Sequence, residues 1–99
     1  MAVYFIANYD VEDAKAYEAY VPMVMPVLQK HGAELIAADQ GTRSLEGQGG
    51  AMTAILKFES EEAAMAWYND PDYAPALKLR LSATTNGIGL LANEFVPPK

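Results

Sequence analysis

The stretch "AMTAILKFESEEAAMAWYNDPDYAPALKLR", residues 51–80, places a strand, a helix, a turn and a second helix in one continuous run. Residues 51–58 form a short apolar run of the kind that favours a strand. Ser60 predicts a helix start, because its hydroxyl can accept a hydrogen bond from a free backbone amide. Glu61 and Glu62 follow in the first turn, where their charge complements the helix dipole. A strand leading directly into a capped helix is therefore expected here.

A second helix is predicted over about residues 72–83, after the interruption "NDP" at 69–71. Asp72 is the better cap for this helix. It places Pro75 in the first turn, where the missing N–H of proline costs little.

Upstream of this run, residues 2–9 ("AVYFIANY") are β-branched and aromatic, which predicts another strand. Apolar residues at helical spacing then extend over 13–31, with Asp13 as the expected cap. Pro22 and Pro26 lie on the opposite, polar side of this stripe. Because proline removes an amide hydrogen bond and bends a helix, we expect one bent helix or two short ones.

The middle of the chain and its end provide the remaining strands. Gly32 is the expected left-handed cap of the preceding helix. Residues 33–46 predict a strand interrupted near Gly41, by a bulge or a tight bend. "GQGG" at 47–50 is typical of a hairpin turn, and residues 86–95 predict the final strand.

The order β-α-β-β-α-β, with the second helix doubled, is typical of the ferredoxin-like α+β fold. It predicts one domain over residues 1–96, with a four-stranded antiparallel sheet, helices on one face, and a frayed tail over 97–99. A wet sheet face should be polar, and an uncovered apolar patch marks an interface. We therefore predict a homodimer in which two sheets pack face to face. The open face carries Tyr4, Ile6, Ile55 or Leu56, and Leu90 or Leu91, depending on register.

The composition disfavours several classes of partner. Thirteen acidic residues against seven basic ones give a net charge of −6, which disfavours nucleic acid and anionic membranes. The absence of cysteine excludes disulfides and thiolate chemistry and fits a reducing compartment. The N-terminus lacks a signal-peptide pattern, and no apolar run reaches the roughly 18 residues of a membrane span. A cytoplasmic location is expected.

The pieces "YEAYVP", "HGAELIAA", "GTRSLEG", "FESEEAAMAWYNDPDY" and "LKLR" follow one another in the order of one known family. The chain resembles, from end to end, the short dimeric α/β-barrel proteins of domain of unknown function 1330. This resemblance implies the ferredoxin-like fold and the homodimer. It implies no particular activity.

Similar dimeric barrels include cofactor-independent quinone-forming monooxygenases, muconolactone isomerases, haem-degrading monooxygenases and peroxidase-like haem proteins. The resemblance implies a ligand site between the sheet and the helices. In the haem-degrading members an Asn, a Trp and a haem-ligating His on the last helix serve the site, and Asn8 and Trp67 would occupy comparable places. The last helix here offers Leu77 and Arg80 but no histidine, so we expect no haem and no other cofactor.

His31, the only histidine, has two interpretations. It can serve as a general base near neutral pH. More often, a histidine at a helix C-terminus interacts with free carbonyls and the dipole. One histidine with scattered carboxylates falls short of a metal site, so no metal is expected.

Four aromatic residues are candidates for a ligand-binding wall. Trp67 and Tyr68 are adjacent and cannot both face the core centre, so one of them is expected to border a cavity. Aromatic residues at helical spacing are more often core, and the same holds for Tyr17 and Tyr20. If the hydroxyls of Tyr17 and Tyr20 are buried they need partners, and a ligand is one option.

Arg43 and Arg80 are the sharper signal. Arg43 follows the expected strand break, and Arg80 lies on an apolar helix face, where a guanidinium must pair with a carboxylate. An internal salt bridge is favoured over a bound anion. The internal partners available are Glu34, Glu46 and Asp70.

Two functions from different classes are therefore predicted. The first is a homodimer whose subunits each hold a small organic molecule, with His31 or Arg80 as candidates for chemistry. Any reaction would be proton transfer or oxygenation without a cofactor, because no cofactor motif is present. The second is a dimeric module that binds a metabolite or partner without catalysis. The candidate wall residues are Asn8, Tyr17, Tyr20, Arg43, Trp67 and Tyr68.

Overall fold

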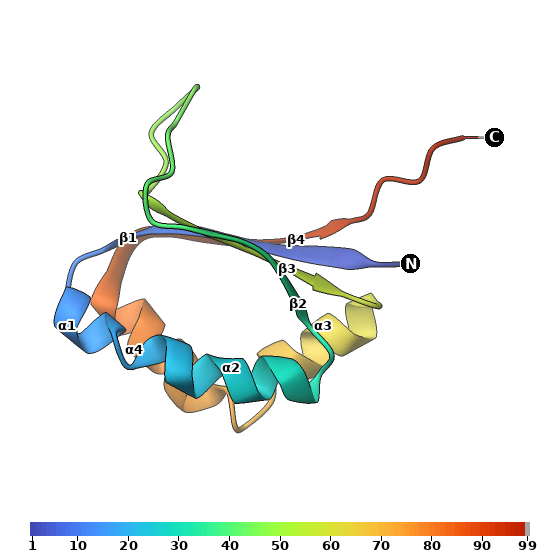
Figure 1. The fold of residues 1–99 in the computed structure, drawn as a ribbon, viewed down its shortest axis with the longest axis horizontal. Helices are drawn as coiled ribbons and strands as arrows, with labels where there is room; N and C mark the ends of the chain where they lie inside the picture. The colour runs from blue at the N-terminus through green and yellow to red at the C-terminus, as the bar shows by residue number, and fades with distance from the viewer. Residues whose placement is uncertain (99) are drawn as a thin grey trace.

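A computed structural model describes residues 1–98 and has the predicted β-α-β-β-α-β order, with both helical segments divided in two. The sheet order is β2-β3-β1-β4, every neighbouring pair is antiparallel, and the helices lie on one face only (Figure 1). The predicted α+β ferredoxin-like class is therefore confirmed. The elements are β1 (Val3–Val11), α1 (Ala14–Tyr17), α2 (Tyr20–Lys30), β2 (Glu34–Asp39), β3 (Met52–Phe58), α3 (Glu61–Tyr68), α4 (Ala74–Ala83) and β4 (Thr84–Asn93).

The sheet register decides which apolar side chains face the helices. Ile6 in β1 lies opposite Ile55 in β3 and opposite Leu90 in β4. Directly opposite residues share a face, so these three side chains point away from the helices, whereas Leu56 and Leu91 share the inner face. The alternatives left open by the sequence are thus settled in favour of Ile55 and Leu90.

The core lies between the sheet and the helices and is centred on Trp67. This indole is fully buried, and its ring centroid lies 4.4 Å from that of Tyr73, 5.3 Å from Phe5 and 5.4 Å from Phe58. Aromatic contacts of this kind contribute beyond the area that they bury. The aromatic cluster in "WYNDPDY" is therefore first a packing device between α3, α4 and the sheet.

Two of the three predicted helix caps, Asp13 and Ser60, form the expected hydrogen bonds. Asp13 accepts a hydrogen bond from the Ala16 amide, and Ser60 accepts one from the Ala63 amide. The expected cap Asp72 is wrong, because α4 begins later and its first turn has no side-chain cap. The Asp72 carboxylate instead accepts a hydrogen bond from Lys30.

The segment 13–31 forms two helices, the second of the two options predicted. Pro22 and Pro26 are exposed, as expected for prolines on the solvent side. Gly32 has the left-handed φ of +69° that was predicted for it.

The strand predicted over 33–46 is wrong in length, because β2 ends at Asp39. The Asp39 carboxylate accepts hydrogen bonds from the Gly41 amide and the Thr42 hydroxyl, a turn that ends the strand. Residues 40–51, including "GQGG", form a loop that rises on the side opposite the helices (Figure 1). Of the two alternatives predicted near Gly41, the tight bend is therefore present, and the register shift in β2 lies earlier, between Leu35 and Ala37.

The face of the sheet opposite the helices is uncovered and carries an apolar row, flanked by polar residues such as Lys57 and Asn8. On the edge strand β4, Leu90 is 51% exposed and Ile88 is 55% exposed. Leu45 in the 40–51 loop and Phe95 in the tail are 83% and 80% exposed, and both segments rise on this side (Figure 1). Residues 94–98 form no helix or strand, and the last residue of the predicted tail, Lys99, lies outside the described residues. None of the described helices has the length and apolar character needed to cross a membrane.

Candidate functional site

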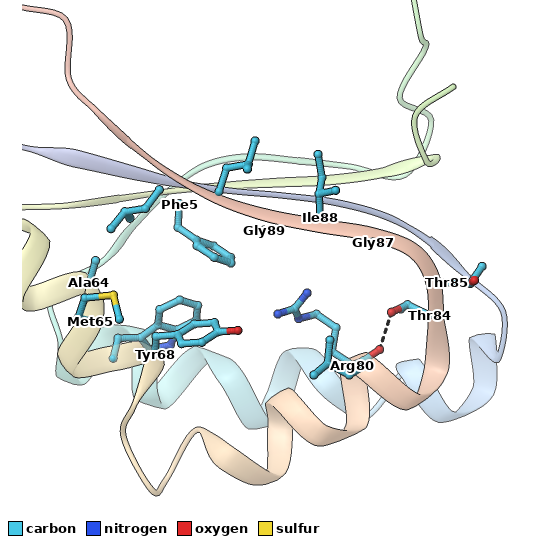
Figure 2. Close-up of a pocket in the computed structure, with 14 residues that line it drawn as sticks. Phe5, Ala64, Met65, Tyr68, Arg80, Thr84, Thr85, Gly87, Ile88 and Gly89 are labelled. Atoms are coloured by element: carbon cyan, nitrogen blue, oxygen red, sulfur yellow. Dashed lines mark hydrogen bonds between the residues drawn. The ribbon is translucent and has the colours of Figure 1, made fainter. Parts of the chain in front are cut away.

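A cavity of about 480 Å³ lies between β4 on one side and α3 and α4 on the other. Figure 2 shows the side chains that surround it, with Phe5 projecting from the sheet and Tyr68 and Arg80 from the helices. The lining is mostly apolar, and among residues 1–98 Arg80 is its only charged member.

Two glycines in β4 make room for the cavity, because they have no side chains to fill it. Gly87 and Gly89 alternate with outward-facing Ile88 and Leu90, so the inner side of the strand carries no side chain at these two positions. A methyl group on Gly87 would come no closer than 3.6 Å to any neighbour, its nearest contact being Tyr9 Cβ. The inner surface of β4 is therefore open at Gly87, whereas at Gly89 the Phe5 ring covers it, since a methyl group there would come within 3.2 Å of that ring.

A bulge near the start of β4 shapes the same wall. Asn8 pairs with Ile88 and Asp10 pairs with Thr85, so Asn86 and Gly87 together oppose the single residue Tyr9. Asn86 has a left-handed φ of 56°, a conformation that asparagine tolerates better than most residues. The bulged strand bends over α4, and Figure 2 shows it curving down to meet that helix.

Arg80 is buried at the wall of the cavity without a carboxylate partner. Its side chain is 6% exposed, and no ion pair forms to it from residues 1–98. Its guanidinium carbon lies 5.5 Å from the centre of the Tyr9 ring, and its Nε has no hydrogen-bond acceptor. Burial lowers the pKa of Arg80, but Tyr73 and Tyr20 outweigh this and leave the pKa raised, so the charge is retained. The favoured internal salt bridge is therefore wrong.

Figure 2 shows the Arg80 guanidinium projecting into the cavity from α4 and the Tyr68 hydroxyl pointing toward it from α3. Thr84 donates a hydrogen bond of 2.6 Å to the Arg80 carbonyl oxygen, which fixes the junction between α4 and β4. Of the sequence candidates, the structure brings Trp67, Tyr68 and Arg80 together around one space.

Tyr17 and Tyr20 belong to a separate network of hydroxyl pairs. Tyr17 is paired with Tyr9, and Tyr20 is paired with Tyr73 at 3.1 Å. These hydroxyls are hydrogen-bonded to one another, so they need no ligand as a partner. None of the four residues is in the cavity lining. Tyr17 also borders a second hollow, of about 470 Å³, beside β1 and α1.

The buried tyrosines make the stability of the protein sensitive to alkaline pH. Burial is the main cause that raises the pKa of Tyr9 and of Tyr20 above the ordinary value. A raised folded-state pKa contributes stability that is complete below the unfolded pKa of about 10 and is lost as pH rises above it. In an alkaline titration we expect a late phase of tyrosinate absorbance that coincides with loss of circular dichroism, and Tyr20→Phe should diminish that phase. Ionisation of all six tyrosines in one step near pH 10, with the fold intact, would contradict this.

His31 lies at the end of α2, in an ion-pair cluster away from the cavity. Its Nε2 is 2.7 Å from Asp70 Oδ2, and Lys30 Nζ is 2.8 Å from the same oxygen. Lys30 first, then His31, holds the pKa of Asp70 well below its ordinary range. This cluster ties α2 to the connection between α3 and α4, a structural role that differs from the general base considered for His31.

Asn8 and Arg43 are also separate from the cavity. The Asn8 side chain donates to the carbonyl oxygens of Gly50 and Met52 and to the Thr53 hydroxyl, and it accepts from the Gly50 amide at 2.6 Å. It therefore anchors the 40–51 loop to β1. Arg43 is exposed on that loop.

Most lining residues were missed from sequence, among them Phe5 and the two glycines of β4. A signal existed in "NGIGLL", where glycines at alternate positions of a strand leave one face bare. Among residues 1–98, no group of three or more histidine and carboxylate side chains is placed to hold a metal ion.

A family model described as "Domain of unknown function (DUF1330)" matches residues 2–93. No curated protein matches the chain.

Several solved structures are similar to this fold at low sequence identity. A protein of unknown function from Rhodopseudomonas palustris has a TM-score of 0.81 at 20% identity, over 97% of this chain and 84% of that chain. SnoaB, a cofactor-independent oxygenase from Streptomyces nogalater, has a TM-score of 0.67 at 12% identity, over 98% of both chains. A dimeric protein of unknown function with a ferredoxin-like fold, from Bacteroides fragilis, has a TM-score of 0.59 at 12% identity, over 95% of this chain and 96% of that chain. At these identities the similarity shows the fold alone.

Proposed function

This chain belongs to the family of domain of unknown function 1330, and from that premise we propose that it is a homodimer whose subunits each bind a small organic molecule in the cavity beneath β4. If the protein is an enzyme, its reaction is proton transfer or oxygenation without a cofactor.

The open face of the sheet supports the homodimer. Ile6, Ile55 and Leu90 form an aligned row across three strands on the side that no helix covers. An antiparallel sheet that faces water on one side is ordinarily polar there, and a large apolar patch marks an interface. A second copy of the same sheet would cover this row with like side chains.

One observation carries the ligand-binding proposal: a buried guanidinium without a carboxylate faces an open, mostly apolar cavity. The cavity volume of about 480 Å³ falls within the range typical of small-molecule sites. An unpaired buried charge destabilises a protein, so a charge kept at the wall of a cavity favours a binding role over a packing role.

The chemistry proposed for the site follows from Arg80 and Tyr68. A positive guanidinium stabilises an enolate or phenolate, which is the form of an organic molecule that takes up a proton or reacts with dioxygen. The Tyr68 hydroxyl is a second polar group that points into the cavity. SnoaB, which has a similar fold, is described as a cofactor-independent oxygenase.

A second candidate is a dimeric module that binds its ligand without catalysis. It is favoured by the absence of a clear general base in the cavity lining: His31 is tied to Asp70, and burial raises the pKa values of the nearby Tyr9 and Tyr20 hydroxyls. Exchange of solvent deuterium into a bound keto acid, or dioxygen uptake in its presence, would separate the enzyme from the module.

Filling the cavity should abolish ligand binding without unfolding the protein. Gly87→Leu places a side chain into open space, because its Cβ meets nothing closer than 3.6 Å. In a thermal-shift screen of aromatic and keto acids, a ligand at a hundredfold its Kd adds about 2.7 kcal/mol and should raise the midpoint by about 10 °C or more. We expect that shift for the natural sequence and its absence in Gly87→Leu.

The matched control is Gly41→Leu, which adds the same side chain to an exposed loop position. It should respond as the natural sequence does. If no compound in a broad panel raises the midpoint, or if Gly87→Leu responds fully, then the cavity is not a binding site.

A further inference from the structure

We propose that the molecule bound in this cavity is an aromatic monoanion whose charged oxygen atoms face Arg80 and Tyr68. This inference rests on the proposed function and names the class of ligand.

A positive charge without a carboxylate partner at the wall of the cavity carries the inference. Figure 2 shows the Arg80 guanidinium projecting into the space, no ion pair forms to it from residues 1–98, and its buried Nε–H group has no acceptor there. A buried donor without an acceptor costs free energy, so such groups call for an explanation. An occupant rich in acceptor oxygens would supply what the protein does not.

The surrounding side chains offer Arg80 a neutral partner but no anion. Among residues 1–98, no aspartate or glutamate is in the cavity lining. The Tyr73 hydroxyl, which pairs with that of Tyr20, also interacts with the guanidinium, and the Thr84 hydroxyl donates to the Arg80 carbonyl oxygen. The anionic partner that a buried guanidinium requires is therefore expected to come from the ligand.

The charge of the site selects a monoanion. Arg80 is the only charged residue that the described part of the chain places in the lining, so a single negative charge is compensated. A dianion would leave its second charge among apolar side chains such as Leu91 and Ala64, and such a charge is costly to desolvate.

The shape of the site selects a flat ring. The backbone of Gly87 forms one wall together with the Phe5 ring, which lies against Gly89, and Trp67 and Tyr68 of α3 form another. Phe5 lies with its ring centroid 5.3 Å from Trp67 and 6.0 Å from Tyr68. Aromatic ligands make favourable offset or edge contacts with walls of this kind.

Titration calorimetry with the whole chain tests this inference. Three compounds that share the naphthalene ring system are compared: naphthoate, its neutral amide, and the corresponding dicarboxylate. We expect naphthoate to bind at least about tenfold more tightly than the amide, because a hydrogen bond to a charged group contributes about 1.5–3 kcal/mol. The dicarboxylate should bind more weakly than naphthoate.

Two substitutions in α4 test whether Arg80 causes the preference for naphthoate over the amide. Arg80→Met should make the Kd values of naphthoate and the amide nearly equal, whereas Lys78→Met, which removes an exposed charge two residues earlier, should leave their ratio unchanged. Tyr68→Phe should weaken naphthoate and leave the amide less affected.

Different results would overturn the monoanion inference and the proposal that the cavity binds a ligand. Equal affinities for naphthoate and the amide, both lost in Gly87→Leu, would overturn the monoanion while leaving the cavity as a binding site. An unchanged preference in Arg80→Met would also overturn it. No binding of any of the three compounds at millimolar concentration would overturn the inference, and the broad panel tested with Gly87→Leu would then decide on the cavity.

Discussion

Arg80→Met is expected to raise the free energy of unfolding of the ligand-free protein by about 1–3 kcal/mol, because replacing a buried charge by an apolar side chain of similar length is often stabilising. In the natural sequence the guanidinium is 6% exposed and lacks a carboxylate partner. The stacking of Arg80 over Tyr9 at 5.5 Å offsets part of its burial. Urea unfolding followed by circular dichroism measures the difference at a fixed protein concentration.

Lys78→Met is the control, since Lys78 is exposed on the same helix and its loss should change stability by no more than about 0.5 kcal/mol. A gain in stability together with lost binding is the trade-off expected where a strained, destabilised site serves function. If Arg80→Met instead destabilises the protein as strongly as a truncated core residue does, then Arg80 is a structural element of the tyrosine network and the binding proposal loses its basis.

Ile6→Asp is expected to dissociate the proposed homodimer. Ile6 lies at the centre of the open face, between Ile55 and Leu90, so two copies of the new carboxylate would be buried without a partner. An unpaired buried charge costs about 3 kcal/mol or more, which corresponds to at least a hundredfold rise in the dimer Kd. Sedimentation velocity at micromolar concentration would detect the change.

Gln29→Glu serves as a control, because it adds the same charge at an exposed position on α2, on the helical side. It should remain dimeric. Circular dichroism should show that Ile6→Asp keeps its secondary structure, since the side chain points away from the core of its own subunit. A natural sequence that is monomeric at micromolar concentration, or an unchanged dimer for Ile6→Asp, would contradict the face-to-face interface.

The fold was largely predictable because its signals are local. Asp13 and Ser60 determine helix starts through single hydrogen bonds to nearby amides, and such bonds depend only on short sequence spacing. The loop over 40–51 was not predicted, since "DQGT" is compatible with both a bulged strand and a turn. The hydrogen bond that Asn8 donates to the Gly50 carbonyl oxygen and the one that it accepts from the Gly50 amide hold the end of the loop to β1, and sequence spacing does not reveal them.

The site was predictable only in part because a cavity is a property of packing. Trp67, Tyr68 and Arg80 were selected for their chemistry, and they do converge. His31 was selected for the same reason, but the packing of α2 against the turn at Asp70 gives it a carboxylate partner instead. Gly87, which leaves the cavity open, carries no side-chain chemistry at all.

A crystal structure of the protein with naphthoate bound would test the central proposal most directly. We expect electron density for the ring between the glycines of β4 and Trp67, with the carboxylate oxygens within hydrogen-bond distance of the Arg80 guanidinium. Density for naphthoate only on the outer surface, with Arg80 turned toward a carboxylate of its own chain, would contradict the proposed binding site.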